Sequence, residues 1–209
     1  MNSSRFEAVI FDCDGVMFDT TKANTAYYNH ILDHFGKPEM TPEQFAYAHM
    51  HTVDEALVHL FGDEAERAAA FAFRSQMSYL PFLRFMRIEP DLMSLLAYLR
   101  PAFRTAIATN RTDTMQRVLQ SNGLSAAFDL VVTALDVAKP KPYPDQLNKI
   151  LTHFNLKPKQ AVYIGDSEVD AAAADAAGVP FAAYANRKLD ARYHISRLRQ
   201  VKDILNSPS

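Results

Sequence analysis

Five short hydrophobic runs recur along the chain, and none of them alternates regularly with polar residues. They are FEAVIF (6–11), TAIAT (105–109), LVVTA (130–134), AVYIG (161–165) and VPFAAYA (179–185). A strand is apolar throughout when both faces of its sheet are covered, as in a parallel sheet between two layers of helices. We therefore predict that these runs form the strands of one parallel sheet.

Between these runs, apolar residues recur at helical spacing. The stretches 115–119, 147–154 and 198–205 each place them on one helical face, and the alanine-rich stretch 170–177 ends at a glycine. An alternation of strand and helix predicts a doubly wound α/β fold. The basic stretch 187–202 also has helical spacing, and we interpret it as a solvated helix face rather than a surface for nucleic acid or membrane.

One connection is far longer than a sheet crossover requires. A crossover needs about a dozen residues, whereas the segment between Asp12 and Thr105 contains the helix-like stretches EQFAYAHM, VDEALVHLF and EAERAAAFAFRSQMSYL. We predict a separate helical domain over 20–87, inserted into a core domain made of 1–19 and 88–209.

Composition narrows the choice of partner and compartment. The net charge of −2 gives no long-range attraction to nucleic acid, and 48% hydrophobic residues are typical of a globular protein. The single cysteine, Cys13, excludes an internal disulfide and favours a reducing compartment. No apolar stretch approaches the roughly 20 residues of a membrane helix, and the N-terminal segment does not resemble a signal peptide. We expect a cytoplasmic, soluble protein without a nucleic-acid or membrane partner, and the sequence leaves its oligomeric state open.

Polar side chains lie at or shortly after the ends of three of the five runs. They are Asp12 and Asp14 after the first run, Thr109 and Asn110 after the second, and Asp166 and Asp170 after the fourth. Ligands of open α/β sheets bind at the carboxyl ends of the strands, so we expect these groups to face one site. The lysines of KPKPYPD (139–145) are able to reach the same place.

This set of side chains is suited to phosphoryl transfer. Asp12, Asp14 and Asp166 offer the hard oxygen ligands that Mg²⁺ prefers, and the cation would offset the repulsion between close carboxylates. A carboxylate is a competent nucleophile towards phosphorus, and a second one acts as a general acid and base. A lysine and a threonine hydroxyl stabilise the charge of the transferring group.

The motifs FDCDGVMFDT, IATN, KPYPD and YIGDSEVD resemble, in order and spacing, the four motifs of the haloacid dehalogenase superfamily. The resemblance covers roughly residues 6–19 and 88–185, and it is closest to phosphoglycolate-phosphatase-like members with a helical cap after the first motif. It implies a Rossmann-like core, bound Mg²⁺ and an aspartyl-phosphate intermediate.

The resemblance also implies a role for each matching residue. Asp12 corresponds to the nucleophile and Asp14 to the general acid and base. The Mg²⁺ ligands would be the Asp12 carboxylate, the backbone carbonyl of Asp14, and Asp166. Thr109, with Asn110 beside it, corresponds to the phosphate-binding hydroxyl, and Asp170 to the acid that supports the metal ligands and the lysine.

Two lysines compete for the third motif. We prefer Lys141, because Pro142, Pro144 and Asp145 then align with the helix entry that follows in the family, and Lys139 is the alternative. The glycine that usually precedes this motif is absent.

These assignments predict a Mg²⁺-dependent phosphatase that acts on a small phosphorylated metabolite resembling phosphoglycolate, a sugar phosphate or a nucleotide. The first alternative is a phosphoglucomutase-type transferase, but Asn24 stands where such mutases carry a histidine. Dehalogenases and phosphonatases are disfavoured by Asp14, and a catalytically silent binding protein is disfavoured because every catalytic residue type is present.

Four residues of the predicted cap have no settled role. His49 and His51 lack a third ligand for zinc at suitable spacing, so we interpret them as a surface turn or as a loop that contacts substrate. Arg84 and Arg87 precede the return to the core, and we expect them to be solvated rather than substrate-binding.

Overall fold

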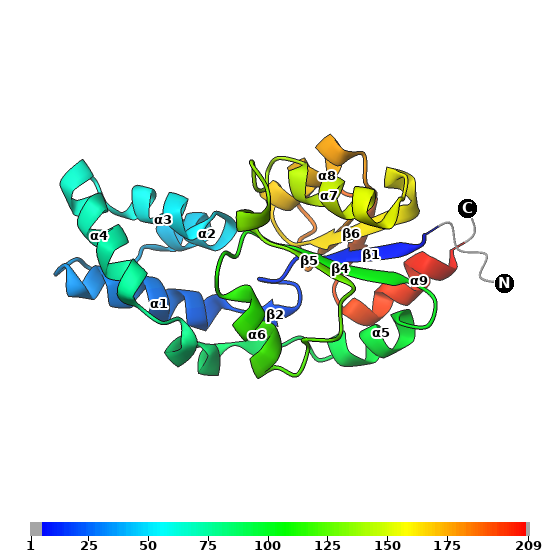
Figure 1. The fold of residues 1–209 in the computed structure, drawn as a ribbon, viewed down its shortest axis with the longest axis horizontal. Helices are drawn as coiled ribbons and strands as arrows, with labels where there is room; N and C mark the ends of the chain where they lie inside the picture. Colours follow the sequence, from blue (N-terminus) through cyan, green and yellow to red (C-terminus); the bar gives the residue numbers. More distant parts are fainter. Residues whose placement is uncertain (1–5, 208–209) are drawn as a thin grey trace. The chain divides into compact units, whose positions relative to one another are not determined.

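The computed structural model describes residues 6–207, which divide into two compact units. One unit contains the described residues up to Phe18 and from Ile88 onwards, and the other is Asp19–Arg87. The first unit holds a large sheet, and the second is helical (Figure 1). Among the residues described, no helix is long and apolar enough to cross a membrane.

Six parallel strands form the sheet of the first unit, in the order β5-β4-β1-β6-β7-β8. The strands are β1 (Ala8–Phe11), β4 (Arg104–Ala108), β5 (Leu130–Val132), β6 (Ala161–Gly165), β7 (Phe181–Tyr184) and β8 (Tyr193–Ile195). The first five coincide with the five apolar runs. The prediction of a doubly wound parallel sheet is therefore confirmed.

Helices cover both faces of this sheet, which explains why its strands lack polar alternation. On one face lie α7 (Asp145–Phe154) and α8 (Glu168–Ala177), and on the other lie α5 (Leu92–Leu99), α6 (Met115–Ser121) and α9 (Val201–Asn206) (Figure 1). Every residue of β1 and β6 is buried between these layers.

The register of the three central strands decides where the site forms. Phe11, the last residue of β1, is paired with Ile107 of β4 and with Ile164 of β6. The carboxyl ends of these strands are thus level. From β1 the sheet continues through β4 to β5 on one side and through β6 and β7 to β8 on the other. Such a switch point is where ligands bind in open α/β sheets.

The second unit is a helical domain with its own core. Its elements are α1 (Thr21–His34), α2 (Pro42–Met50), α3 (Val53–Leu60), α4 (Glu64–Gln76) and the 3₁₀ helix η1 (Leu80–Phe85). Tyr27, Ile31, Leu57 and Phe61 are among its buried residues. Two short strands, β2 (Phe18–Asp19) and β3 (Arg87–Ile88), pair where the chain leaves and re-enters the sheet unit.

The stretch 187–202 differs from its interpretation as a helix face. It contains the edge strand β8, which pairs with β7, and the 3₁₀ helix η4 (Leu198–Gln200), and only its last two residues belong to α9. Ile195 is buried while His194 is exposed, so the segment does alternate. A strand of three residues is too short for this period to outweigh the helical spacing around it. Short 3₁₀ turns also form at η2 (Ala134–Asp136) and η3 (Pro158–Gln160).

Candidate active site

Asp12 is the first residue beyond β1 and lies almost fully buried, with 6% of its surface exposed. Its backbone N–H donates to the carbonyl of Ile164 at 2.9 Å, which extends the β1–β6 pairing by one residue. The chain then turns at Gly15, whose φ of 79° is unfavourable for other residues. A Cβ atom at Gly15 would lie 2.0 Å from Oδ2 of Asp166, so glycine is also what lets these two segments approach.

Lys141 lies at the centre of the site, with 2% of its surface exposed. Its Nζ donates to Oδ1 of Asp12 at 2.7 Å, to Oδ1 of Asp170 at 2.7 Å and to the hydroxyl of Tyr163 at 3.0 Å. Burial disfavours its charge, but the two carboxylates outweigh burial and raise the pKa of Lys141. Lys139 is exposed instead, with its Nζ 4.9 Å from the centre of the Tyr143 ring.

Asn110 and Gln146 hold the backbone around Lys141. The Asn110 amide accepts from the Lys141 N–H at 3.1 Å and donates to the Lys141 carbonyl at 3.0 Å. Gln146 accepts from the same N–H at 3.3 Å and donates to the carbonyl of Thr109 at 2.6 Å. The segments that carry Thr109 and Lys141 are therefore held together by the buried amide side chains of Asn110 and Gln146.

Asp170 organises the start of α8. One carboxylate oxygen accepts from the backbone N–H groups of Asp166 and Ser167, at 3.2 and 3.1 Å, and from the Ser167 hydroxyl. The other accepts from Tyr163 at 2.6 Å and from Lys141. Burial alone would raise the pKa of Asp170, but Lys141 and these hydrogen bonds lower it, so the group is held as a carboxylate.

Three aspartates form a cluster that fits a divalent metal ion. Asp12, Asp166 and Asp170 each offer a carboxylate oxygen, and these atoms lie within 4.8 Å of one another. Burial and then the charge of Asp170 raise the pKa of Asp166 well above its usual value. Burial also raises the pKa of Asp12, to about 7, with Lys141 opposing and Asp170 and Asp14 adding to the effect. A cation would relieve this crowding of like charges, and carboxylate oxygens suit Mg²⁺ or a similar hard ion.

The Asp14 carboxylate forms an ion pair with Arg111. The Arg111 guanidinium donates two hydrogen bonds to this carboxylate in a bidentate fork, with Nε 2.7 Å from Oδ2 and Nη2 2.7 Å from Oδ1. The backbone N–H of Arg111 donates to the Thr109 hydroxyl at 3.1 Å, and Thr109 itself is buried. Arg111 thus links the general-acid candidate to the phosphate-binding candidate.

The remaining sequence candidates lie within the helical unit. His49 is 3.1 Å from the Asn24 amide, which in turn accepts from the Tyr79 hydroxyl at 2.7 Å. His51 stacks on Tyr47 with ring centres 3.9 Å apart. Arg84 and Arg87 are exposed. None of these residues belongs to the acidic cluster found among the described residues.

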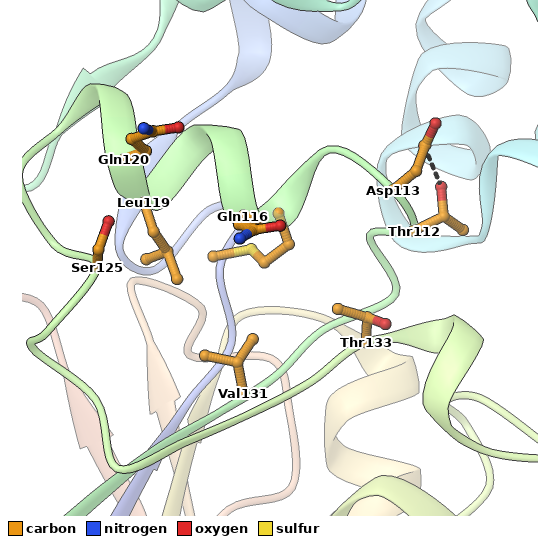
Figure 2. A pocket seen from close by; sticks show the side chains of 9 residues that line it. Thr112, Asp113, Gln116, Leu119, Gln120, Ser125, Val131 and Thr133 are labelled. Atoms are coloured by element: carbon orange, nitrogen blue, oxygen red, sulfur yellow. Dashed lines mark hydrogen bonds between the residues drawn. The ribbon is translucent and has the colours of Figure 1, made fainter.

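A pocket of about 480 Å³ opens beside α6 and β5 (Figure 2). Thr112 and Asp113 line one end of it, Ser125 lines the other, and Leu119 and Val131 form part of its walls. Asp12, Asp14, Thr109, Lys141 and Asp166 are not among its lining residues. The pocket is therefore separate from the acidic cluster.

Comparisons with known proteins identify the family. Residues 9–184 match the model of the haloacid dehalogenase-like hydrolases. The chain belongs to this family. The resemblance read from the four motifs is thereby confirmed.

Individual relatives agree with the family match. A haloacid dehalogenase-superfamily hydrolase of subfamily IA from Geobacter sulfurreducens is 37% identical, with 98% of each chain covered and a TM-score of 0.81. A phosphoglycolate phosphatase from Nitrosospira multiformis is 31% identical over 82% of this chain and 80% of its own. The pyrophosphatase PpaX from Bacillus velezensis is 27% identical over 88% of this chain and 86% of its own. This haloacid dehalogenase-like protein is therefore an enzyme of the phosphatase type.

Sequence reasoning missed three side chains of this haloacid dehalogenase-like site. Tyr163 lies inside an apolar strand run and has no polar neighbour in sequence to mark it. Gln146 follows the helix-entry signal and resembles an ordinary residue of a first helical turn. Arg111 did carry a signal, because a basic residue follows Thr109 and Asn110 directly at a strand end.

Proposed function

We propose that the protein is a Mg²⁺-dependent phosphatase that hydrolyses a small phosphomonoester through an aspartyl phosphate on Asp12. The observation that carries this proposal is the contact of Lys141 with both Asp12 and Asp170 beside Asp166. This contact brings the proposed nucleophile Asp12, the positive charge of Lys141 and the proposed metal ligand Asp166 together at the carboxyl ends of β1 and β6.

Lys141 and the fold orient Asp12 for attack. One oxygen of the Asp12 carboxylate accepts from Lys141, so the carboxylate is fixed in direction before the substrate arrives. The Thr109 hydroxyl and Lys141 bind the phosphoryl oxygens, and Asn110 and Gln146 keep the Lys141 backbone in place. We therefore assign to the Asn110 side chain a positioning role through Lys141.

Asp12, Asp166 and the backbone carbonyl of Asp14 would hold the Mg²⁺. When bound, the ion supplies positive charge to the phosphoryl oxygens and neutralises the crowded carboxylates. Asp170 has its oxygens on Lys141, Tyr163 and the start of α8, so its role is to position the ligands around it.

Asp14 serves the leaving group and the water. It protonates the departing oxygen as the phosphoryl group moves to Asp12, and it then takes a proton from the water that hydrolyses the aspartyl phosphate. A dehalogenase does not need an acid at the position of Asp14, so the presence of Asp14 disfavours dehalogenation. Phosphoglucomutase chemistry stays the weaker alternative, because Asn24 is engaged with Tyr79 and His49 in the position where the mutases carry a histidine.

A panel of phosphorylated compounds tests the proposal. Purified protein is incubated with an aryl phosphate, phosphoglycolate, sugar phosphates and nucleoside monophosphates, and released phosphate is measured with Mg²⁺ and with EDTA. We expect release that depends on Mg²⁺ and a preference for one class of substrate. Folded protein that releases no phosphate from any member of the panel would overturn the proposal, and transfer to a second sugar hydroxyl without phosphate release would favour the mutase.

A further inference from the structure

The Asp14 carboxylate is occupied on both of its oxygens by Arg111. Nε and Nη2 of the guanidinium lie 2.7 Å from Oδ2 and Oδ1, while Nη1 donates to the Thr114 hydroxyl at 3.1 Å. The side chains of Arg111 and Asp14 are 8% and 13% exposed, so the pair is shielded but reaches the surface of its unit. The fork is the geometry in which arginine binds carboxylates and phosphates most strongly.

This arrangement conflicts with the role proposed for Asp14. A general acid must place a protonated oxygen within about 2.6–3.2 Å of the leaving oxygen, whereas the fork from Arg111 engages both oxygens of Asp14 in its ionised form. The ion pair must therefore open in each turnover. Opening it without replacement would separate a shielded guanidinium from the carboxylate that accepts two of its hydrogen bonds, which is unfavourable.

A substrate anion removes that difficulty. A carboxylate or a second phosphate group presents the same pair of oxygens as Asp14 and fits the same fork. Arg111 is well placed to receive it, because its backbone N–H contacts the Thr109 hydroxyl, next to the phosphoryl group in the proposed mechanism. Exchange of Asp14 for the substrate's second anion would keep the guanidinium paired and free Asp14 for the leaving group.

We propose that Arg111 selects substrates that carry a second anionic group close to the leaving oxygen, and that binding of this group releases Asp14 for catalysis. This inference rests on the proposed phosphatase function and defines its substrate class. The preferred substrates are compact phosphate esters or anhydrides with a carboxylate or a second phosphate. Substrates that end in a neutral group have to open the ion pair without replacing it.

The test compares three substrates in the presence of Mg²⁺: phosphoglycolate with its carboxylate, pyrophosphate with its second phosphate, and ethyl phosphate with neither. In the unaltered enzyme, we expect kcat/KM for at least one of the first two to exceed that for ethyl phosphate by about 10- to 100-fold, the size of a hydrogen-bonded charge contact. The two anionic substrates show whether the fork accepts a carboxylate, a phosphate or both.

Arg111→Gln should abolish this preference, chiefly by lowering kcat/KM for the anionic substrates. The ratio between substrates is measured within one protein sample, so a lower folded fraction does not alter it. Arg117→Gln removes the same charge from an exposed position of α6 and should leave the ratio unchanged. A preference of the same size in Arg111→Gln would overturn the inference while leaving the phosphatase function intact, and an unaltered enzyme that cleaves none of these substrates nor an aryl phosphate would remove both.

A structural readout is independent of turnover. In a crystal structure of Asp12→Asn with the preferred anionic substrate, the guanidinium of Arg111 should contact the second anion and Asp14 should be detached from it. Arg111 still forked on Asp14 with that substrate bound would contradict the exchange.

Discussion

Lys141 and Asp170 form a buried ion pair, with Nζ 2.7 Å from Oδ1 and the two side chains 2% and 0% exposed. Their residues come from a loop before α7 and from the first turn of α8. Burying a charge is unfavourable unless it is paired and hydrogen-bonded, and each member here has several partners. The pair therefore makes the fold around the site depend on the same groups that the proposed chemistry needs.

Replacing Lys141 should test this dependence. Lys141→Met leaves Asp12 and Asp170 buried without their cation, and we expect a loss of about 3–5 kcal/mol in the free energy of unfolding, together with loss of activity. Lys139→Met removes an exposed charge and should change stability by no more than about 0.5 kcal/mol. Urea unfolding of both variants checks this, and equal effects would contradict the central position of Lys141.

The nucleophile assignment predicts a loss of turnover without loss of fold. Asp12→Asn keeps the size of the side chain but removes the charge needed for attack on phosphorus, so we expect kcat to fall below detection. Asp175→Asn makes the same change at an exposed position of α8 and should keep full activity. Circular dichroism confirms the fold of both, and undiminished turnover in Asp12→Asn would remove the assignment.

Metal binding should depend on pH. The pKa of Asp12 is raised to about 7, by burial first and then by nearby carboxylates, and that of Asp166 is raised as well. A cation binds the deprotonated forms, so Mg²⁺ binding should release protons and weaken as pH falls below about 7, by about tenfold per pH unit for each proton released. Calorimetric titrations in two buffers of different ionisation enthalpy measure the released protons. A Kd that is unchanged from pH 6 to pH 8 would argue against ligation by these carboxylates.

Gly15 offers a way to disturb the proposed metal ligand Asp166. In Gly15→Ala, the new Cβ would lie 2.0 Å from Oδ2 of Asp166 at a φ of 79°, so Asp166 has to move and Mg²⁺ affinity should fall. Gly123→Ala has a similar φ of 70° and no heavy atom within 4 Å of the new Cβ. It should lose only the backbone contribution of about 1 kcal/mol and keep its Mg²⁺ affinity. Equal Mg²⁺ affinities in the two variants would show that the close approach of Gly15 and Asp166 is unimportant.

Five strands and the four motifs could be predicted from the sequence because each is encoded by residues that are adjacent in the chain. Continuous apolar runs indicated covered strands, and the polar residues after them indicated the edge at which a site forms. The edge strand β8 could not be predicted, since Tyr193–Ile195 pairs with β7 over too few residues to show an alternating pattern of buried and exposed side chains. The sequence favoured Lys141 but did not exclude Lys139 as the lysine of the third motif, because the sequence contexts of the two residues overlap.

The sequence by itself determined the first five strands of the sheet, the family, and the set of acidic and basic groups at the strand ends. The tertiary structure decided which of these groups meet. Register brought Asp12, Thr109 and Asp166 to one edge, and the turn after β4 directed Arg111 onto Asp14. Lys141 is buried in contact with Asp12 and Asp170, whereas Lys139 is exposed. These outcomes depend on distances between residues far apart in the chain, and no local pattern encodes a distance of that kind.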